Sequence, residues 1–451
     1  MTHSAALPTH AALDAIDRAH LIHPVSPWRT HEARGPMVLE SAQGVWLKDN
    51  NGHRLLDAFA GLWCVNVGYG QESVIQAAAD QMRKLPYATG YFHFSSEPAI
   101  RLAEKLVQIT PASLTRVYMT LGGSESVDAA VRFIVQYYNA TGRPSKKHFI
   151  SLERGYHGSS STGAGLTALP AFHRGFDLPL PTQHYIPSPN PYRQAGAADP
   201  QALIAESVAA LRAKVAELGA ENVAAFFCEP IQGSGGVIVP PEGWLKAMRE
   251  ATRELDILLV VDEVITGFGR CGAWTGAQAF GVTPDILNFA KQVTNGAQPL
   301  GGVIATKEIY DTFMAAGGPE YMLEFPHGYT YSAHPVACAA GNAVLDILQK
   351  EDAPGRVKAL APYFQSAVHG LKGAKHVADI RNYGLAAGFT IAALPGEPAR
   401  RPYEIAMKCW DKGFYVRYGG DTIQLAPPFI STEAEIDRLV SALGDALDET
   451  A

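Results

Sequence analysis

Short apolar segments alternate with helical patterns through most of the chain, and this alternation restricts the folds that it can adopt. Strands are expected at residues 116–120, 147–152, 223–228, 257–261, 286–289 and 302–305. Helices are expected around and between them, at residues 97–109, 124–140, 201–218 and 243–255. The proline-rich stretch 176–200 interrupts the pattern and is predicted as a long surface loop. Apolar strands separated by helices form βαβ units, so the sequence predicts an α/β fold with a mostly parallel central sheet.

A second, smaller α+β domain is expected from the two ends of the chain. Residues 45–58 place Asn51 and Gly52 between two short apolar runs, which is a strong hairpin signal. Beyond residue 336, a helix is followed by shorter strands around 377–393 and 414–426 and by a final helix. A chain of 451 residues is also too long for one compact core. We expect an N-terminal part of the small domain at 1–64, a large domain at 65–335 and the C-terminal part of the small domain at 336–451.

Charge and composition exclude several classes of function. The net charge of −7 gives no reason to expect nucleic acid or an anionic membrane as a partner. No apolar stretch approaches the ~18–20 residues of a membrane-spanning helix, and no secretory signal is evident at the N-terminus. The five cysteines are scattered without a CxxC pair, as in reduced cytosolic proteins. We expect a cytoplasmic protein, and the absence of zinc-type Cys/His spacing predicts no metal site.

Two apolar runs, ILLVVDEV and DILNFAK, carry the charged residues Asp262 and Lys291 near their ends. Ligands of an open α/β sheet collect beyond the carboxyl ends of its strands, so both side chains are expected at one edge. A lysine in an apolar wall can be kept neutral and can attach covalently to an aldehyde. A carboxylate beside a pyridine nitrogen favours the protonated ring, which then withdraws electrons. The pair therefore predicts pyridoxal phosphate chemistry.

Other strand ends carry further parts of such a site. Gly123 and Ser124 begin a helix, whose exposed N–H groups and hydroxyl suit a phosphate. Tyr156 follows the strand KHFISL as a ring for stacking, and Glu229 follows the strand VAAFFC. Each feature alone has an ordinary structural explanation, such as a helix cap or a packing residue. Their occurrence at consecutive strand ends favours a cofactor site.

Residues 267–272 match the pattern GxGxxG and offer a rival interpretation. The dinucleotide fingerprint requires a strand, a glycine turn and a helix in immediate succession, whereas these glycines stand past the strand end without a clear helix start. A nicotinamide-dependent oxidoreductase is therefore a remote alternative, and a non-catalytic binding protein for small molecules is less well supported again. The sequence also lacks the GxSxG elbow of a serine hydrolase.

The motifs together resemble the class III aminotransferases, fold-type I transferases that depend on pyridoxal phosphate. The segments that carry the resemblance are, in family order, GGSESVDAAVR, GYHG, EPIQG, DEVITGFGR, FAK followed by NGAQPLGGV, and HGYTYSAHP. The resemblance extends from about residue 40 to the C-terminus. GLWCVNVGYG and YVRYGGDTIQLAPP are similar to one branch, the ω-amino acid–pyruvate (β-alanine–pyruvate) transaminases.

The resemblance implies a role for each matching residue. Lys291 would hold pyridoxal 5′-phosphate covalently and shuttle a proton, and Asp262 would pair with the ring nitrogen. Trp63 would wall the substrate pocket, and Phe92, by position, would line the pocket of a neighbouring subunit. The other cofactor contacts would be Val264 and Tyr156 on opposite ring faces, Gly123 and Ser124 at the phosphate, Glu229 nearby, and Thr330 at the neighbouring subunit's phosphate.

Three positions bear on the substrate. Arg417 offers a planar fork that can hold a carboxylate through two parallel hydrogen bonds, as pyruvate requires. Relatives that use 2-oxoglutarate commonly carry a glutamate that masks this arginine, whereas this chain has Ser234 there. Where many relatives have a glutamine, Ile265 cannot hydrogen-bond the phenolic oxygen of the cofactor. The first two features favour pyruvate as the amino acceptor.

We expect a homodimer with shared active sites, or a tetramer of paired dimers, that follows a ping-pong cycle. An ω-amino acid such as β-alanine would pass its amino group to the cofactor, giving pyridoxamine phosphate, and would leave as a semialdehyde. Pyruvate would then take up the amino group and leave as L-alanine. Alternatives within the same fold are a transaminase for taurine, 4-aminobutyrate or a simple amine, and an aminomutase.

Overall fold

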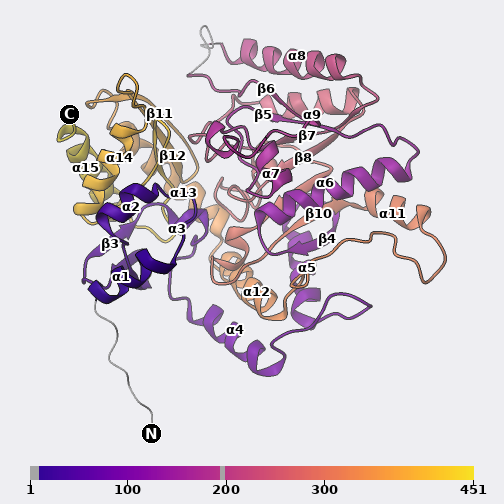
Figure 1. Ribbon diagram of the computed structural model, residues 1–451, viewed down its shortest axis with the longest axis horizontal. Coiled ribbons are helices and arrows are strands. Elements are labelled where there is room, and N and C mark those ends of the chain that lie inside the picture. The colour runs from indigo at the N-terminus through magenta and orange to yellow at the C-terminus, as the bar shows by residue number, and fades with distance from the viewer. Residues whose placement is uncertain (1–9, 193–198) are drawn as a thin grey trace.

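The computed structural model describes residues 10–192 and 199–451, and its centre is a seven-stranded sheet (Figure 1). The strands are, in spatial order, β4 (Leu114–Thr120), β10 (Gly301–Thr306), β9 (Ile286–Phe289), β8 (Leu258–Asp262), β7 (Val223–Cys228), β5 (His148–Leu152) and β6 (Gln183–Ile186). Strand β10 runs antiparallel to both of its neighbours, whereas the five strands from β9 to β6 are parallel. The predicted α/β fold with a mostly parallel sheet is confirmed.

Alternate residues of the central strands enter different cores. Phe227 and Val260 pack into one core, whereas Phe226, Leu259 and Val261 pack into another. A strand buried on both faces needs apolar residues at every position, which explains its unbroken apolar sequence. The helices and short helical turns of this region are α4 (Glu72–Lys84), α5 (Glu97–Ile109), α6 (Gly123–Ala140), α7 (Ser161–Leu166), η1 (Pro170–Phe172), α8 (Pro200–Leu218), α9 (Trp244–Glu254), α10 (Gly276–Ala279), η2 (Lys291–Thr294), α11 (Lys307–Ala316) and α12 (Pro335–Lys350).

Two smaller sheets combine the N-terminal and C-terminal parts of the chain. One contains β1 (Leu39–Gln43), β2 (Trp46–Asp49), β3 (Arg54–Asp57) and β13 (Phe414–Tyr415), and the other contains β11 (Val377–Tyr383), β12 (Ala386–Ile391), β15 (Thr422–Leu425) and β14 (Arg417–Gly419). The helices beside them are α1 (His10–His20), α2 (Trp28–Arg34), α3 (Ala60–Trp63), α13 (Ala353–His369), α14 (Arg400–Asp411) and α15 (Glu433–Asp448). The hairpin at Asn51-Gly52 is confirmed, because β2 and β3 pair antiparallel around it. In Figure 1 the indigo N-terminal helices lie beside the yellow C-terminal elements, since β3 pairs with β13.

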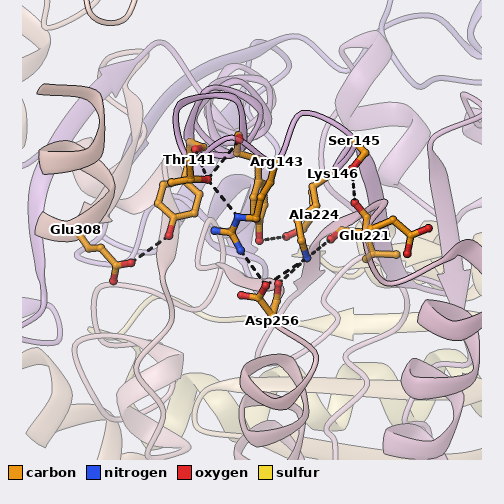
Figure 2. Close-up of polar contacts among 11 residues, drawn as sticks. Thr141, Arg143, Ser145, Lys146, Glu221, Ala224, Asp256 and Glu308 are labelled. Atoms are coloured by element: carbon orange, nitrogen blue, oxygen red, sulfur yellow. Dashed lines mark hydrogen bonds and ion pairs between the residues drawn. The ribbon is translucent and has the colours of Figure 1, made fainter. Parts of the chain in front are cut away.

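A polar network holds the amino ends of three central strands, at the edge opposite the strand ends that carry Asp262 and Lys291 (Figure 2). Lys146 is buried, and its Nζ donates hydrogen bonds to the carbonyls of Val223 and Asp256, at 3.0 and 2.7 Å. Arg143 pairs with the carboxylate of Asp256 at 2.8 Å. These contacts join the segments that enter β5, β7 and β8.

One expectation about secondary structure was wrong, and several elements were not predicted. The stretch 176–200 is not a continuous loop, because Gln183–Ile186 form β6 and pair parallel with β5 at the sheet edge. Prolines flank this four-residue strand closely and hide its alternation, and residues 193–198 lie outside the described part of the chain. Elements that were not predicted are helices α1, α2, α3, α4, α7, α10, α11 and α14, and strand β1. No helix in the described residues is long and apolar enough to cross a membrane.

Candidate active site

Neighbouring strands bring Asp262 and Lys291 to the same edge of the sheet. Asp262 ends β8 and pairs with Asn288 of β9, three positions before Lys291. Lys291 begins the short turn η2 with φ of 48°, in the left-handed region that costs a side-chain-bearing residue about 1–3 kcal/mol. Strain of this kind persists where the surroundings fix the backbone, and it is often stored at functional sites. The strand-end argument therefore placed the pair correctly.

A buried histidine fixes the carboxylate of Asp262. His157 Nδ1 donates to Asp262 Oδ2 at 2.9 Å, and the N–H of Val264 donates to Oδ1 at 3.1 Å. Burial alone would lower the pKa of His157, but the hydrogen bond and charge of Asp262 outweigh burial and raise that pKa. The hydrogen bond from His157 therefore fixes the orientation of the carboxylate. Sequence reasoning assigned no role to His157, although its place beside Tyr156 at a strand end was a usable signal.

The amine of the half-buried Lys291 differs from that of the buried Lys146. Burial lowers the pKa of Lys291, and the nearby charge of Arg417 lowers it further, while Cys64 and Asp262 act in the opposite direction. Lys146 donates to two carbonyls, whereas no hydrogen bond or ion pair engages the Lys291 amine within residues 10–192 and 199–451. An uncommitted amine with a lowered pKa is the nucleophile that an aldehyde cofactor needs.

The start of α6 forms a close cradle with the loop after β5. Ser124 Oγ accepts a hydrogen bond from the N–H of Ser159 at 3.0 Å. A Cβ on Gly158, whose φ is 106°, would approach Ser124 Oγ to 2.7 Å and Ser124 Cα to 2.8 Å. A Cβ on Gly123 would lie 3.2 Å from both methyl groups of Val264. The helix N-terminus thus presents bare backbone and a hydroxyl beside Val264, which fits the phosphate end of pyridoxal phosphate.

Glu229 braces the loop that carries Tyr156. Its Oε1 accepts the N–H of Tyr156 at 2.9 Å, and its Oε2 accepts the N–H of Gly233 at 3.0 Å. Burial raises the pKa of Glu229 to about 7, against the opposing charge of His157. The ring of Tyr156 lies edge-on to Phe172 and its hydroxyl is 3.1 Å from Ser159 Oγ. Glu229 therefore acts on the site through the backbone of the residues around it.

An apolar wall faces this edge from the small sheets. Trp63 is 2% exposed, and its indole N–H has no partner among the described residues. The Arg417 guanidinium carbon lies 5.6 Å from the ring centroid of Phe59, which in turn packs edge-on against Trp63. Burial lowers the pKa of Arg417, and no carboxylate pairs with it in residues 10–192 or 199–451. This guanidinium is therefore available to an anionic ligand. Ile265 belongs to the same apolar cluster as Trp63.

Phe92 and Thr330 lie apart from these residues within one chain. Phe92 is 79% exposed with φ of 56°, and its ring contacts only Tyr91 among the described rings. Thr330 is exposed, and its carbonyl accepts a hydrogen bond from the Tyr87 hydroxyl at 3.0 Å. One chain therefore does not bring these two predicted site residues into the cluster.

The GxGxxG segment has a structural function instead of a nucleotide-binding one. Residues 267–272 form turns, and the buried Arg270 donates to the carbonyls of Leu385 and Pro427, at 3.1 and 2.7 Å. Its guanidinium also lies over the ring of Phe429, at 4.7 Å from the centroid. The segment therefore connects the central sheet with the C-terminal elements, and no helix follows it directly.

Comparison with known proteins identifies relatives along almost the whole chain. The family model described as aminotransferase class-III matches residues 29–447. The chain is 43% identical to the omega-amino acid–pyruvate aminotransferase of Pseudomonas putida, covering 98% of this chain and 99% of that protein. It is also 43% identical to the beta-alanine–pyruvate aminotransferase of Pseudomonas aeruginosa, covering 96% of each. A PLP-bound amine transaminase from an uncultivated Pseudomonas species superposes with a TM-score of 0.92 at 35% identity, covering 96% and 99% of the two chains.

Proposed function

The chain belongs to the class III aminotransferases, which use pyridoxal phosphate, and we propose that it transfers the amino group of an ω-amino acid such as β-alanine to pyruvate. The products are a semialdehyde and L-alanine. When bound, the cofactor supplies the electron sink that stabilises negative charge on the substrate carbon. Two relatives at 43% identity carry names for this activity, which supports pyruvate as the acceptor.

The arrangement around Lys291 supports a division of roles. Lys291 would hold the cofactor covalently and would carry a proton to and from the substrate carbon, because its amine is uncommitted and its pKa is lowered. Asp262, held by His157, would present its carboxylate to the ring nitrogen. The supporting contacts are assigned to Gly123 and Ser124 at the phosphate, Tyr156 and Val264 at the ring faces, and Glu229 behind them.

The unpaired Arg417 is the observation that carries the substrate assignment. Its guanidinium lies in an apolar wall with Phe59 and Trp63, where a carboxylate can be held through two hydrogen bonds. Ser234 supplies no charge to mask it, so pyruvate reaches a free cation. Donors with a distant carboxylate, or none, need only the apolar wall. Taurine, 4-aminobutyrate and simple amines are therefore the alternative donors.

Large exposed apolar side chains support a homodimer with shared active sites. Phe92, Tyr321 and Leu323 are 79%, 86% and 74% exposed, which is unusual for large apolar side chains. In the proposed dimer, Phe92 would reach the neighbour's pocket and Thr330 its phosphate site. The five free cysteines suit a reducing, cytoplasmic setting. The pairing of β3 with β13 supports a small domain that draws on both ends of the chain.

An assay of alanine formed from β-alanine and pyruvate tests the proposed reaction. We expect turnover that requires both substrates and pyridoxal phosphate, with 2-oxoglutarate a poor acceptor. A parallel panel with taurine, 4-aminobutyrate and a carboxylate-free amine ranks the donors. Turnover with simple amines alone would replace β-alanine by the alternative donor class, and preference for 2-oxoglutarate would contradict the assignment of the acceptor.

A further inference from the structure

Three side chains with metal-binding atoms meet between the N-terminal helices, away from the residues around Lys291. Asp17 lies on α1, His31 lies on α2, and His23 lies in the turn that joins them. His31 Nε2 is 2.7 Å from Asp17 Oδ1, and His23 Nε2 is 2.9 Å from Asp17 Oδ2. The ligand atoms of all three lie within 4.8 Å of one another. Two imidazoles therefore direct the same ring nitrogen at one carboxylate.

The cluster is sheltered without being closed. The side chains of Asp17 and His31 are 13% and 14% exposed, and that of His23 is 27% exposed. The two imidazole rings lie 4.2 Å apart between centroids, at 40° to each other. Arg18, the nearest cation on the same helix, is bound to Asp14 at 2.9 Å and so leaves Asp17 unneutralised. One side of the cluster thus remains open to solvent, where a water ligand can complete a coordination shell.

The spacing of the three atoms is close to that of a tetrahedral metal site. Ligand atoms ~2.0–2.1 Å from a zinc ion stand about 3.3 Å apart. The two nitrogen–oxygen pairs, now 2.7 and 2.9 Å apart, would each separate by about half an ångström. The Nε2 protons would move to Nδ1, because a metal binds the neutral imidazole through its lone pair. Two imidazoles and a carboxylate suit zinc and related divalent ions better than soft, monovalent ones.

We propose that Asp17, His23 and His31 form a binding site for a divalent transition metal such as zinc, with water as the fourth ligand. A bound ion would clamp α1 to α2 through the intervening turn. Helix α2 is attached to α14 by Arg34, which donates to the hydroxyl of Tyr403 at 2.8 Å. The site would therefore stabilise the N-terminal segment and is independent of the proposed reaction. Sequence analysis predicted no metal site, because these residues match no standard zinc spacing and meet only through the turn.

Calorimetric titration of the untagged, chelator-treated holoenzyme with Zn²⁺ tests this site. We expect one ion per chain, and a rise in the melting temperature on binding. Asp17→Asn, which preserves size, and His31→Ala should each weaken binding at least about tenfold. His20→Ala removes another histidine of α1 and serves as the matched control, with unchanged binding expected. Transaminase activity of each variant confirms that it has folded.

Three results would overturn the proposal. The first is the absence of stoichiometric Zn²⁺ binding by the unaltered holoenzyme. The second is equal binding by His31→Ala and His20→Ala, which would place the ion elsewhere. The third is full affinity in Asp17→Asn, which would leave the cluster as a hydrogen-bonded clamp without a metal.

Discussion

Replacing Arg417 with leucine tests how this enzyme distinguishes substrates with a carboxylate from those without one. Arg417 extends from β14 into the apolar wall, 5.6 Å from the ring centroid of Phe59, and no described carboxylate competes for it. A bound carboxylate accepts two charge-assisted hydrogen bonds from the guanidinium, each worth about 1.5–3 kcal/mol. Part of this energy is offset by the cost of removing the two charges from water. Burial of Arg417 already disfavours its charged form and lowers its pKa. The net loss on truncation is about 3–5 kcal/mol.

This free energy corresponds to a fall in kcat/KM for pyruvate of roughly one hundred to several thousand fold. The two half-reactions are followed separately by rapid mixing, from the loss and return of the yellow cofactor absorbance. A simple amine should convert the Arg417→Leu variant within a few fold of the unaltered rate. Arg417→Lys keeps the charge and loses the planar fork, so an intermediate effect on pyruvate is expected. Equal losses with pyruvate and with the carboxylate-free amine would refute the reasoning, since the arginine would then serve the fold or the cofactor.

Three further substitutions test other parts of the site. Lys291→Ala should reduce turnover by at least about 10⁴-fold because it removes both the covalent attachment and the proton carrier, while bound cofactor is still detected by mass; activity within tenfold of the unaltered enzyme would contradict its role. Asp57 is buried and accepts hydrogen bonds from the N–H of Phe59 at 2.9 Å and the hydroxyl of Tyr69 at 2.7 Å, beside the strained turn that carries Trp63. Asp57→Asn should therefore cost about 2–4 kcal/mol of unfolding free energy in denaturant titrations and raise KM more than it changes cofactor affinity; an unchanged KM would separate this turn from the substrate pocket. Burial raises the pKa of Glu229 to about 7, above its unfolded value near 4.5, so the folded state retains a proton that the unfolded state loses and stability falls as pH rises through this window. Glu229→Gln should reduce the total loss of unfolding free energy across this pH window by on the order of 3 kcal/mol. An identical pH dependence in the variant would show that another group controls the decline.

The sequence predicted the placement of the residues at the sheet edge well because strand ends obey a simple geometric rule. Asp262, Lys291, Gly123 and Ser124 all follow or precede apolar strands of sufficient length to recognise. The carboxyl ends of parallel strands meet at one edge whatever the details of packing. The predicted sheet, its hairpin neighbour and the placement of these residues were therefore accessible from one-dimensional patterns.

Other features depend on contacts between distant segments, which no local pattern records. His157 acts through Asp262, more than one hundred positions away in the chain. Strand β6 is too short, and too closely flanked by prolines, to show alternation. Asp17, His23 and His31 come together only because an unexpected turn joins two unexpected helices. Phe92 and Thr330 lie apart from the other predicted site residues within one chain, because the roles that the resemblance implies for them are in a neighbouring subunit.

The central claim is that Lys291 and Asp262 serve an amino transfer that ends on pyruvate. Single-turnover absorbance of the unaltered holoenzyme tests it most directly, by adding β-alanine first and pyruvate second. We predict that β-alanine bleaches the yellow absorbance and that pyruvate restores it, with one alanine released per active site. Two results would contradict the account. In one, 2-oxoglutarate restores the bleached absorbance and pyruvate does not; in the other, no primary amine bleaches it.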